Sequence, residues 1–339
     1  MRYLSSVYVA GHETSIARSG RSLIVRRGAD KERVPLEGID SVVMLGAVHA
    51  TMDALAACVD HHVRVAVLRR NGRLRFTVGP PASGNVHLRV AQVCAATDDA
   101  AALRLTKLFI AGKLQNSRRV MMRWARDAPS SSARRRIGDR ADLIAERLGR
   151  LSTAPTADHV RGIEGDAARV YFTALGTVLS DTPWRFASRS RRPPRDPVNA
   201  LLGFAYALVV TELVGALEAI GLDHQVGFLH RVRSGRPSLA LDLAEEMRPL
   251  TDRFVVGMLR RREIGAGDFV WTPGGACYLA DEGRAKFLRR WEQAKQVELA
   301  HPVVGRAVER WALPSVQATL LARHLRGDLP TYPPFVIPA

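Results

Sequence analysis

The feature that most constrains the fold is an abrupt change in hydrophobic periodicity near residue 84. Before it, short stretches alternate apolar and polar side chains, as half-buried strands do. After it, apolar residues recur at the three- and four-residue spacing of amphipathic helices. The stretch 79–84, GPPASG, lies at the change and has the composition of a linker. We therefore predict an α+β chain, with a small N-terminal β-rich domain at residues 1–84 and a larger, all-helical C-terminal domain at residues 85–339.

Within these regions the local signals are specific enough to place elements. Strands are expected at 3–9, 15–17, 22–25, 38–46, 64–68 and 73–78. Thr51 is a suitable N-cap for a short helix from Met52 to Asp60, and Asn71-Gly72 predicts a hairpin turn. Helices are expected at 88–127, 134–150, 157–180, 197–221, 237–249, 281–298 and 315–326. The basic stretches 130–136 and 186–197 are expected to be irregular.

The charge balance indicates the class of partner. Fifty basic residues oppose 33 acidic ones among 339, a formal charge of +17, which favours a polyanion. GC-rich coding explains arginine over lysine but not this excess. No apolar run suits a membrane span or a signal peptide, so we expect a cytoplasmic protein without membrane association. Cys58, Cys94 and Cys277 form no disulfide framework, and the first two are expected in the core.

Two helical segments carry carboxylates in apolar surroundings. Glu164 shares a helix face with Ala167, Ala168 and Tyr171, so it points toward the core, where a carboxylate needs a partner or a cation. An acid near a helix start, favoured by the macrodipole, is an equally good interpretation of Glu164 alone.

The later segment, SLALDLAEEMRP, places Asp242 and Glu245 on one helix face, with leucines on nearly every side. The alternative is a solvated face on which Arg248 pairs with an acid. A shift of one residue in the helix phase would turn Glu246 instead of Glu245 toward this face, so Glu246 is an alternative candidate for the second acid.

His230 ends an apolar segment, GFLH, and is by itself more typical of a core or surface histidine than of a ligand. Together with one glutamate and one or two further carboxylates it makes a donor set that suits Mg²⁺ or Mn²⁺ better than zinc. In a strongly basic protein, the matching substrate is a phosphodiester.

Four segments, two of which contain these residues, resemble a known family. They are RGIEGDAARVYF, DPVNALLGFAYAL, GFLHRVRSGRPSLALDLAEEMRPL and GRAKFLRRW, and their order and spacing resemble those of the CRISPR adaptation integrase, the Cas-one protein. The segments GKLQNSRRV and VQATLLARHLRGDLPTYPPF resemble the branch that accompanies subtype I-C systems.

The resemblance implies roles for individual residues. Glu164, His230 and Glu245 match the metal ligands, and Asp242 matches a further catalytic acid that supports the metal or the substrate. Residues matching positions that line the site or bind DNA are Asn199, Tyr206, Arg248 and Lys286. Each of these four also has an ordinary interpretation, as a core aromatic, a first-turn residue or a surface cation.

The resemblance also implies a function. Homodimers would bind double-stranded DNA captured from an invader, and a Cas-two protein would join two of them, with a Cas-four nuclease as a possible further partner. A Mg²⁺- or Mn²⁺-dependent endonuclease and integrase would then insert the fragment into a CRISPR array, an antiviral defence reaction. Charge alone suits a non-catalytic DNA-binding scaffold too. An RNA-binding module is a weaker alternative, because aromatic residues make up only 6% of the chain.

Overall fold

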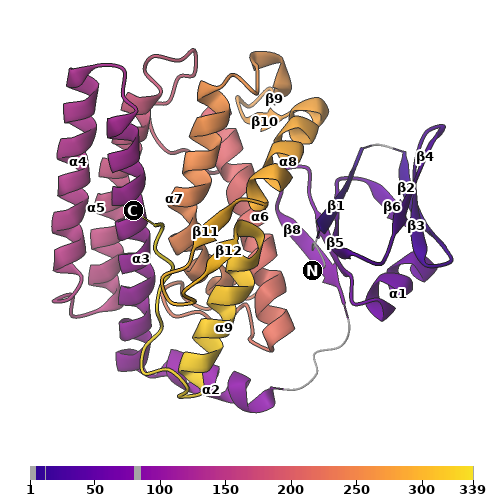
Figure 1. The fold of residues 1–339 in the computed structure, drawn as a ribbon, viewed down its shortest axis with the longest axis horizontal. Coiled ribbons are helices and arrows are strands. Elements are labelled where there is room, and N and C mark those ends of the chain that lie inside the picture. Colours follow the sequence, from indigo (N-terminus) through magenta and orange to yellow (C-terminus); the bar gives the residue numbers. More distant parts are fainter. Residues whose placement is uncertain (1–4, 12, 80–84, 339) are drawn as a thin grey trace.

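The computed structural model describes residues 5–11, 13–79 and 85–338. Strands dominate the part before residue 79 and helices the part after residue 85, which confirms the predicted fold class (Figure 1). Most of the predicted linker, residues 80–84, lies outside the described residues. The C-terminal region is mostly helical and also contains two short antiparallel strand pairs that the sequence analysis did not predict.

The N-terminal region is built from two four-stranded sheets and one helix, α1 (Met52–Asp60). The first sheet has the order β1 (Ser5–Ala10), β5 (Ile39–Leu45), β7 (Arg64–Leu68), β8 (Leu74–Val78). The second has the order β4 (Asp30–Pro35), β3 (Ser22–Arg27), β2 (Thr14–Ser19), β6 (Val48–Ala50). Strand β4 was missed because DKERVP is polar and exposed except at one residue.

The first sheet joins the two regions through side chains that alternate across it. Val42 and Met44 of β5 belong to the N-terminal core, together with residues of the second sheet and α1. Val43 and Leu45, which point to the opposite face, belong to the core of the helical region. Burial on both faces explains why this strand is a continuous apolar run.

The helical region contains eight α-helices among the described residues. They are α2 (Val86–Thr97), α3 (Asp99–Arg126), α4 (Ser131–Arg150), α5 (Ala157–Val178), α6 (Pro197–Ile220), α7 (Ser238–Arg260), α8 (Asp281–Lys295) and α9 (Leu313–Leu325). The short strands are β9 (Phe269–Trp271), β10 (Cys277–Leu279), β11 (Glu298–Ala300) and β12 (Ala307–Glu309). Helix α6 is long and apolar enough to span a membrane by composition, but 72% of its apolar window is buried in the protein, so it is the central core helix.

Several predicted boundaries were wrong for identifiable reasons. The predicted helix 88–127 is broken at Asp98, whose side chain caps α3 by accepting from Ala101 N at 2.7 Å. Residues 131–136 are helical rather than irregular, because Ser130 caps α4 by accepting from Ala133 N. Helix α7 continues past Pro249, where the predicted helix ends. Pro249 has no backbone N–H to donate within the helix, and the buried apolar residues of the last turns offset this lost hydrogen bond. Cys94 is exposed, not in the core.

The hairpin turn predicted at Asn71-Gly72 fixes the N-terminal region against α6. Gly72 has φ +79°, and a Cβ at this position would lie 2.9 Å from Phe204 Cδ2 and 3.1 Å from Ala207 Cβ. The turn therefore approaches α6 as closely as a residue without a side chain allows.

We expect Gly72→Ala to lower the free energy of unfolding by about 2–4 kcal/mol, because it adds an unfavourable left-handed backbone to a steric clash. Gly28→Ala is the matched control, since Gly28 also has positive φ but no atom within 4 Å of the added Cβ. Urea denaturation followed by circular dichroism measures both. Equal losses in the two variants would show that the turn is not tightly packed.

Candidate active site

Three helices bring two carboxylates to one ammonium group. Helix α3, which carries Lys113, packs against α5, which carries Glu164, and against α7, which carries Glu245 (Figure 1). Lys113 Nζ pairs with Glu164 Oε1 and lies 2.6 Å from Glu245 Oε2. The Lys113 and Glu245 side chains are almost fully buried, whereas that of Glu164 is 24% exposed. The cluster therefore opens toward solvent at Glu164.

Glu245 is held as an anion by cations on both sides. Its second oxygen, Oε1, lies 2.8 Å from Arg248 Nη1, one helical turn along α7. Burial raises the pKa of the Glu245 carboxyl, but Arg248, Lys113 and His230 together act more strongly in the opposite direction and lower it to about 2. Glu245 is consequently ionised at any physiological pH.

The imidazole of His230 is oriented by a buried carboxylate. Asp242 is fully buried, and its Oδ1 lies 2.6 Å from His230 Nδ1. The same carboxylate accepts the backbone N–H groups of Phe228, Leu229 and His230, at 2.6, 3.0 and 3.0 Å. Because the carboxylate is an acceptor, Nδ1 carries a hydrogen, and Nε2 is the ring nitrogen left available to a ligand. This is the arrangement in which histidines bind metals through the second nitrogen.

The structure separates Glu245 from Glu246. The Glu246 side chain turns away from Lys113 toward the C-terminal segment, where it accepts from Tyr332 OH at 2.6 Å, Phe335 N at 2.5 Å and Gln317 Nε2 at 2.9 Å. Of the two neighbouring glutamates, only Glu245 contributes to the acidic pair.

Tyr206 and Arg248, two of the residues that the resemblance assigns to the lining of the site, lie beside the cluster. The Tyr206 hydroxyl donates to Asp252 Oδ1 at 2.6 Å, and the Arg248 guanidinium lies over its ring, 5.1 Å from the centroid. Arg189 lies over the same ring at 5.4 Å. Burial raises the pKa of the Asp252 carboxyl to about 6, although the hydrogen bond from Tyr206 and the nearby Tyr171 hydroxyl oppose this.

Asn199 and Lys286 lie outside this direct network. Asn199 is buried at the start of α6, where Oδ1 accepts from Arg189 Nη1 at 2.7 Å, so it holds the loop that supplies Arg189. Lys286 Nζ pairs with Asp268 Oδ1 at 2.8 Å, and none of its hydrogen bonds or ion pairs among the described residues joins it to Glu164, His230 or Glu245. The role of Lys286 as a residue that lines the site stays a prediction.

The predicted metal ligands do not form an open cluster of donor atoms. Within residues 5–11, 13–79 and 85–338, no three His, Cys, Asp or Glu side chains are close enough together to hold a metal ion. The place between Glu164 and Glu245 is taken by the Lys113 ammonium instead. Lys113 was missed as a site residue. Its signal in the sequence was a lysine within the long amphipathic helix of a chain that has only five lysines.

Comparison with known proteins agrees with the resemblance noted in the sequence. Residues 7–293 match the family model described as CRISPR associated protein Cas1. The CRISPR-associated endonuclease Cas1 2 of Rhodospirillum rubrum is 41% identical over 345 residues, and the alignment covers 98% of each chain. A CRISPR-associated exonuclease Cas4/endonuclease Cas1 fusion of the same organism is 35% identical over 331 residues, covering 95% of this chain and 56% of the fusion.

Solved structures share the fold over nearly the whole chain. A casposase bound to integration product has a TM-score of 0.85 at 23% identity, covering 97% of this chain and 92% of that one. A Cas1 protein from Thermotoga maritima has a TM-score of 0.80 at 22% identity, covering 99% of both chains. A Cas6-RT-Cas1--Cas2 complex has a TM-score of 0.81 at 19% identity, covering 99% of this chain and 36% of that one.

The environment of Glu246 predicts a specific pH dependence of stability. Burial raises the pKa of this carboxyl from 4.5 to about 8, against opposing hydrogen bonds from Tyr332, Phe335 and Gln317. The folded protein keeps a proton that the unfolded chain releases, so this group's stabilisation is complete below pH 4.5 and is lost as the pH rises to about 8. The limiting slope is about −1.4 kcal/mol per pH unit.

We expect Glu246→Gln to flatten the decline of unfolding free energy over this pH range, because a glutamine cannot titrate. Urea unfolding at intervals of pH measures the slope, and Glu282→Gln on the exposed start of α8 is the control. A Glu246→Gln profile parallel to that of the unaltered protein would contradict a protonated, buried Glu246.

Proposed function

The chain belongs to the Cas1 family of CRISPR-associated endonucleases, and from that membership we propose that it is a metal-dependent DNA endonuclease and integrase. In the proposed reaction, a 3′-hydroxyl of a captured DNA fragment attacks a phosphodiester in a CRISPR repeat. A new P–O bond forms, the repeat strand's P–O bond breaks, and the repeat strand leaves with a 3′-hydroxyl. The observation that carries this proposal is the convergence of Glu164 and Glu245 on one cationic atom.

The chemistry of the donor set suits a divalent cation. Two carboxylates from different helices already share a cation, and His230 presents Nε2 because Asp242 engages its other nitrogen. We propose that Glu164, His230 and Glu245 hold Mg²⁺ or Mn²⁺, with Asp242 as the residue that positions His230. A bound cation would polarise the scissile phosphate and stabilise the leaving oxygen.

The residues around the acids serve the same chemistry. Lys113 must leave the space between Glu164 and Glu245 when a divalent cation enters, because both cations need the same oxygens. Its ammonium, together with the Arg248 guanidinium, then balances the charge of an incoming phosphate. Tyr206 keeps Arg248 in place through the contact between its ring and the guanidinium.

The substrate and partners follow from charge and from the relatives. A formal charge of +17 supports binding to double-stranded DNA, which should weaken steeply with salt. We propose a homodimer that assembles with a Cas2 protein, supported by a fold shared with a Cas6-RT-Cas1--Cas2 complex. Cooperation with a Cas4 nuclease is supported by the relative in which Cas4 and Cas1 are fused. Assignment to the subtype I-C branch stays a prediction.

Removal of one proposed ligand should separate catalysis from DNA binding. We expect Glu164→Gln and His230→Ala to reduce Mn²⁺-dependent nicking and integration by at least about 100-fold, because each deletes a metal donor. Affinity for duplex DNA should change by less than about threefold, since phosphate contacts come from cationic side chains. Gel-based nicking and fluorescence anisotropy measure the two properties.

The matched control is Glu146→Gln, which removes the same charge from an exposed position on α4. It should leave both properties unchanged. Full nicking activity of Glu164→Gln in Mn²⁺, or equal nicking of the unaltered protein in EDTA and Mn²⁺, would favour a non-catalytic DNA-binding scaffold instead.

Neutralising Lys113 should have opposite effects with and without metal. In EDTA, Lys113→Met leaves the buried Glu245 and the partly exposed Glu164 without the ammonium that they share, and we expect a loss of about 3 kcal/mol in unfolding free energy. Mn²⁺ should bind this variant about tenfold more tightly than the unaltered protein, because no ammonium competes. Denaturation in EDTA and isothermal titration with Mn²⁺ test these two expectations.

Lys107→Met, on the same helix, is the control, since the half-buried Lys107 donates from Nζ to Ser152 O and has no ion pair with a carboxylate among the described residues. In the unaltered protein, Lys113 should also become more reactive toward reductive methylation when Mn²⁺ is added. Weaker Mn²⁺ binding by Lys113→Met would instead identify Lys113 as a permanent part of the site.

A further inference from the structure

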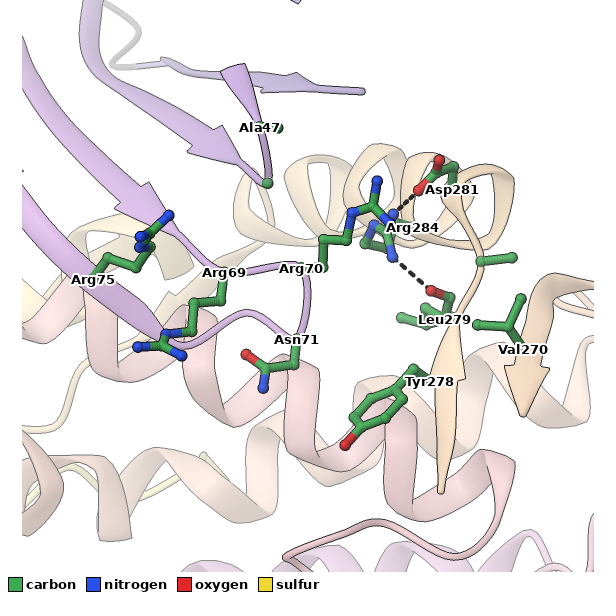
Figure 2. A pocket seen from close by; sticks show the side chains of 12 residues that line it. Ala47, Arg69, Arg70, Asn71, Arg75, Val270, Tyr278, Leu279, Asp281 and Arg284 are labelled. Carbon is green, nitrogen blue, oxygen red and sulfur yellow. Dashed lines mark hydrogen bonds and ion pairs between the residues drawn. The ribbon is translucent and has the colours of Figure 1, made fainter. Parts of the chain in front are cut away.

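A cavity separate from the acidic pair lies where the N-terminal region meets the short strands of the C-terminal region. Its volume is about 780 Å³. Figure 2 shows that the turn between β7 and β8 forms one side and that β9, β10 and the start of α8 form the other. A volume of this size holds one or two nucleotides.

The side formed by the β7–β8 turn is strongly cationic. Arg69, Arg70 and Arg75 are exposed, and within the described part of the chain none of their guanidinium groups has a hydrogen bond or an ion pair. Figure 2 shows Arg70 extending from the turn toward Arg284. Among the described residues that line the cavity, the only acid is Asp281, which is already paired with Arg284. The three unpaired arginines therefore give the cavity a net positive charge.

The opposite side offers apolar and aromatic surface. Val270 of β9 is half exposed, and Tyr278 of β10 lies opposite it in the strand register. Leu279 completes this wall, and its carbonyl accepts from Arg284 Nη1 at 2.6 Å. A ring and an aliphatic side chain next to unpaired guanidinium groups form a surface on which a base can stack while its phosphate is neutralised.

Both sides are held in place before any ligand arrives. The turn is fixed by the contact of Gly72 with Phe204 and by Arg69 N, which donates to Arg73 O at 2.8 Å. The β9–β10 pair is tied to the basic loop before α6, because Cys277 N donates to Pro194 O at 3.0 Å. A preformed pocket loses little entropy when it orders a ligand.

We propose that this cavity binds unpaired nucleotides of a DNA strand, with the arginines of the β7–β8 turn on the phosphates and Tyr278 stacked on a base. This rests on the proposed function only in assuming that the nucleic acid is DNA. Duplex DNA fits the cavity less well, because paired bases do not present their faces to a side chain. The cavity would thus bind a single-stranded end or gap of a DNA molecule whose duplex part is bound elsewhere on the protein.

The test measures fluorescence anisotropy of the full chain with a labelled ten-nucleotide oligothymidine and with a blunt duplex. We expect Arg69→Ala/Arg70→Ala to weaken oligothymidine binding about tenfold and to reduce the salt slope by about 1.4, for two phosphate contacts. Blunt-duplex affinity should change by less than about twofold. Arg134→Ala/Arg135→Ala removes the same charge from the exposed start of α4 and should leave oligothymidine binding unchanged.

Stacking is tested separately from charge. Tyr278→Leu should weaken oligothymidine binding at least about fivefold without changing the salt slope, whereas Tyr278→Phe, which keeps the ring, should bind as the unaltered protein does. The proposal would be overturned if Arg69→Ala/Arg70→Ala weakened oligothymidine and blunt-duplex binding equally. It would also be overturned if Arg134→Ala/Arg135→Ala weakened oligothymidine binding as much as Arg69→Ala/Arg70→Ala does. Unchanged binding by Tyr278→Leu would overturn it too. These outcomes do not depend on Mn²⁺ and so are distinguishable from failure of the proposed catalysis.

Discussion

The site depends on the ion pairs by which the Lys113 ammonium joins Glu164 and Glu245. Two carboxylates facing each other in a largely buried place would repel each other and would lose their hydration. One cation between them removes both costs, so α3, α5 and α7 can pack with their acids turned inward. In the proposed metal site, the same geometry would present carboxylate oxygens, the ligands that a divalent cation such as Mg²⁺ prefers.

Helix α7 shows how neighbouring acids acquire different tasks from their surroundings. Asp242 is saturated by backbone donors and orients His230, so it acts through another residue. Glu245 faces Lys113 and Arg248 and stays ionised. Glu246 faces the C-terminal segment, where burial raises its pKa to about 8 and it holds Tyr332 and Phe335 in place. One of these acids therefore supplies charge to the site, and the other two support its structure.

The sequence predicted what depends on local pattern. The change from strands to helices, the burial around Asp242 and the cap at Thr51 were all correct, because periodicity and capping chemistry are local. The convergence of Glu164 with Glu245 was inferred from a family resemblance rather than from spacing, since it depends on the packing of helices far apart in the chain. Lys113 and the path of α7 beyond Pro249 were missed for the same reason. The resemblance also implies a place near the site for Lys286; the structure shows its ion pair with Asp268, and its role at the site stays a prediction.

The most direct test of the central claim is a crystal structure of the protein soaked in Mn²⁺, with the ion located by its anomalous scattering. We predict one Mn²⁺ with oxygen or nitrogen atoms of Glu164, His230 and Glu245 at about 2.4 Å, and the Lys113 ammonium displaced from between the two glutamates. Lys113 still bridging Glu164 and Glu245 at saturating Mn²⁺, with no anomalous peak beside them, would contradict the account.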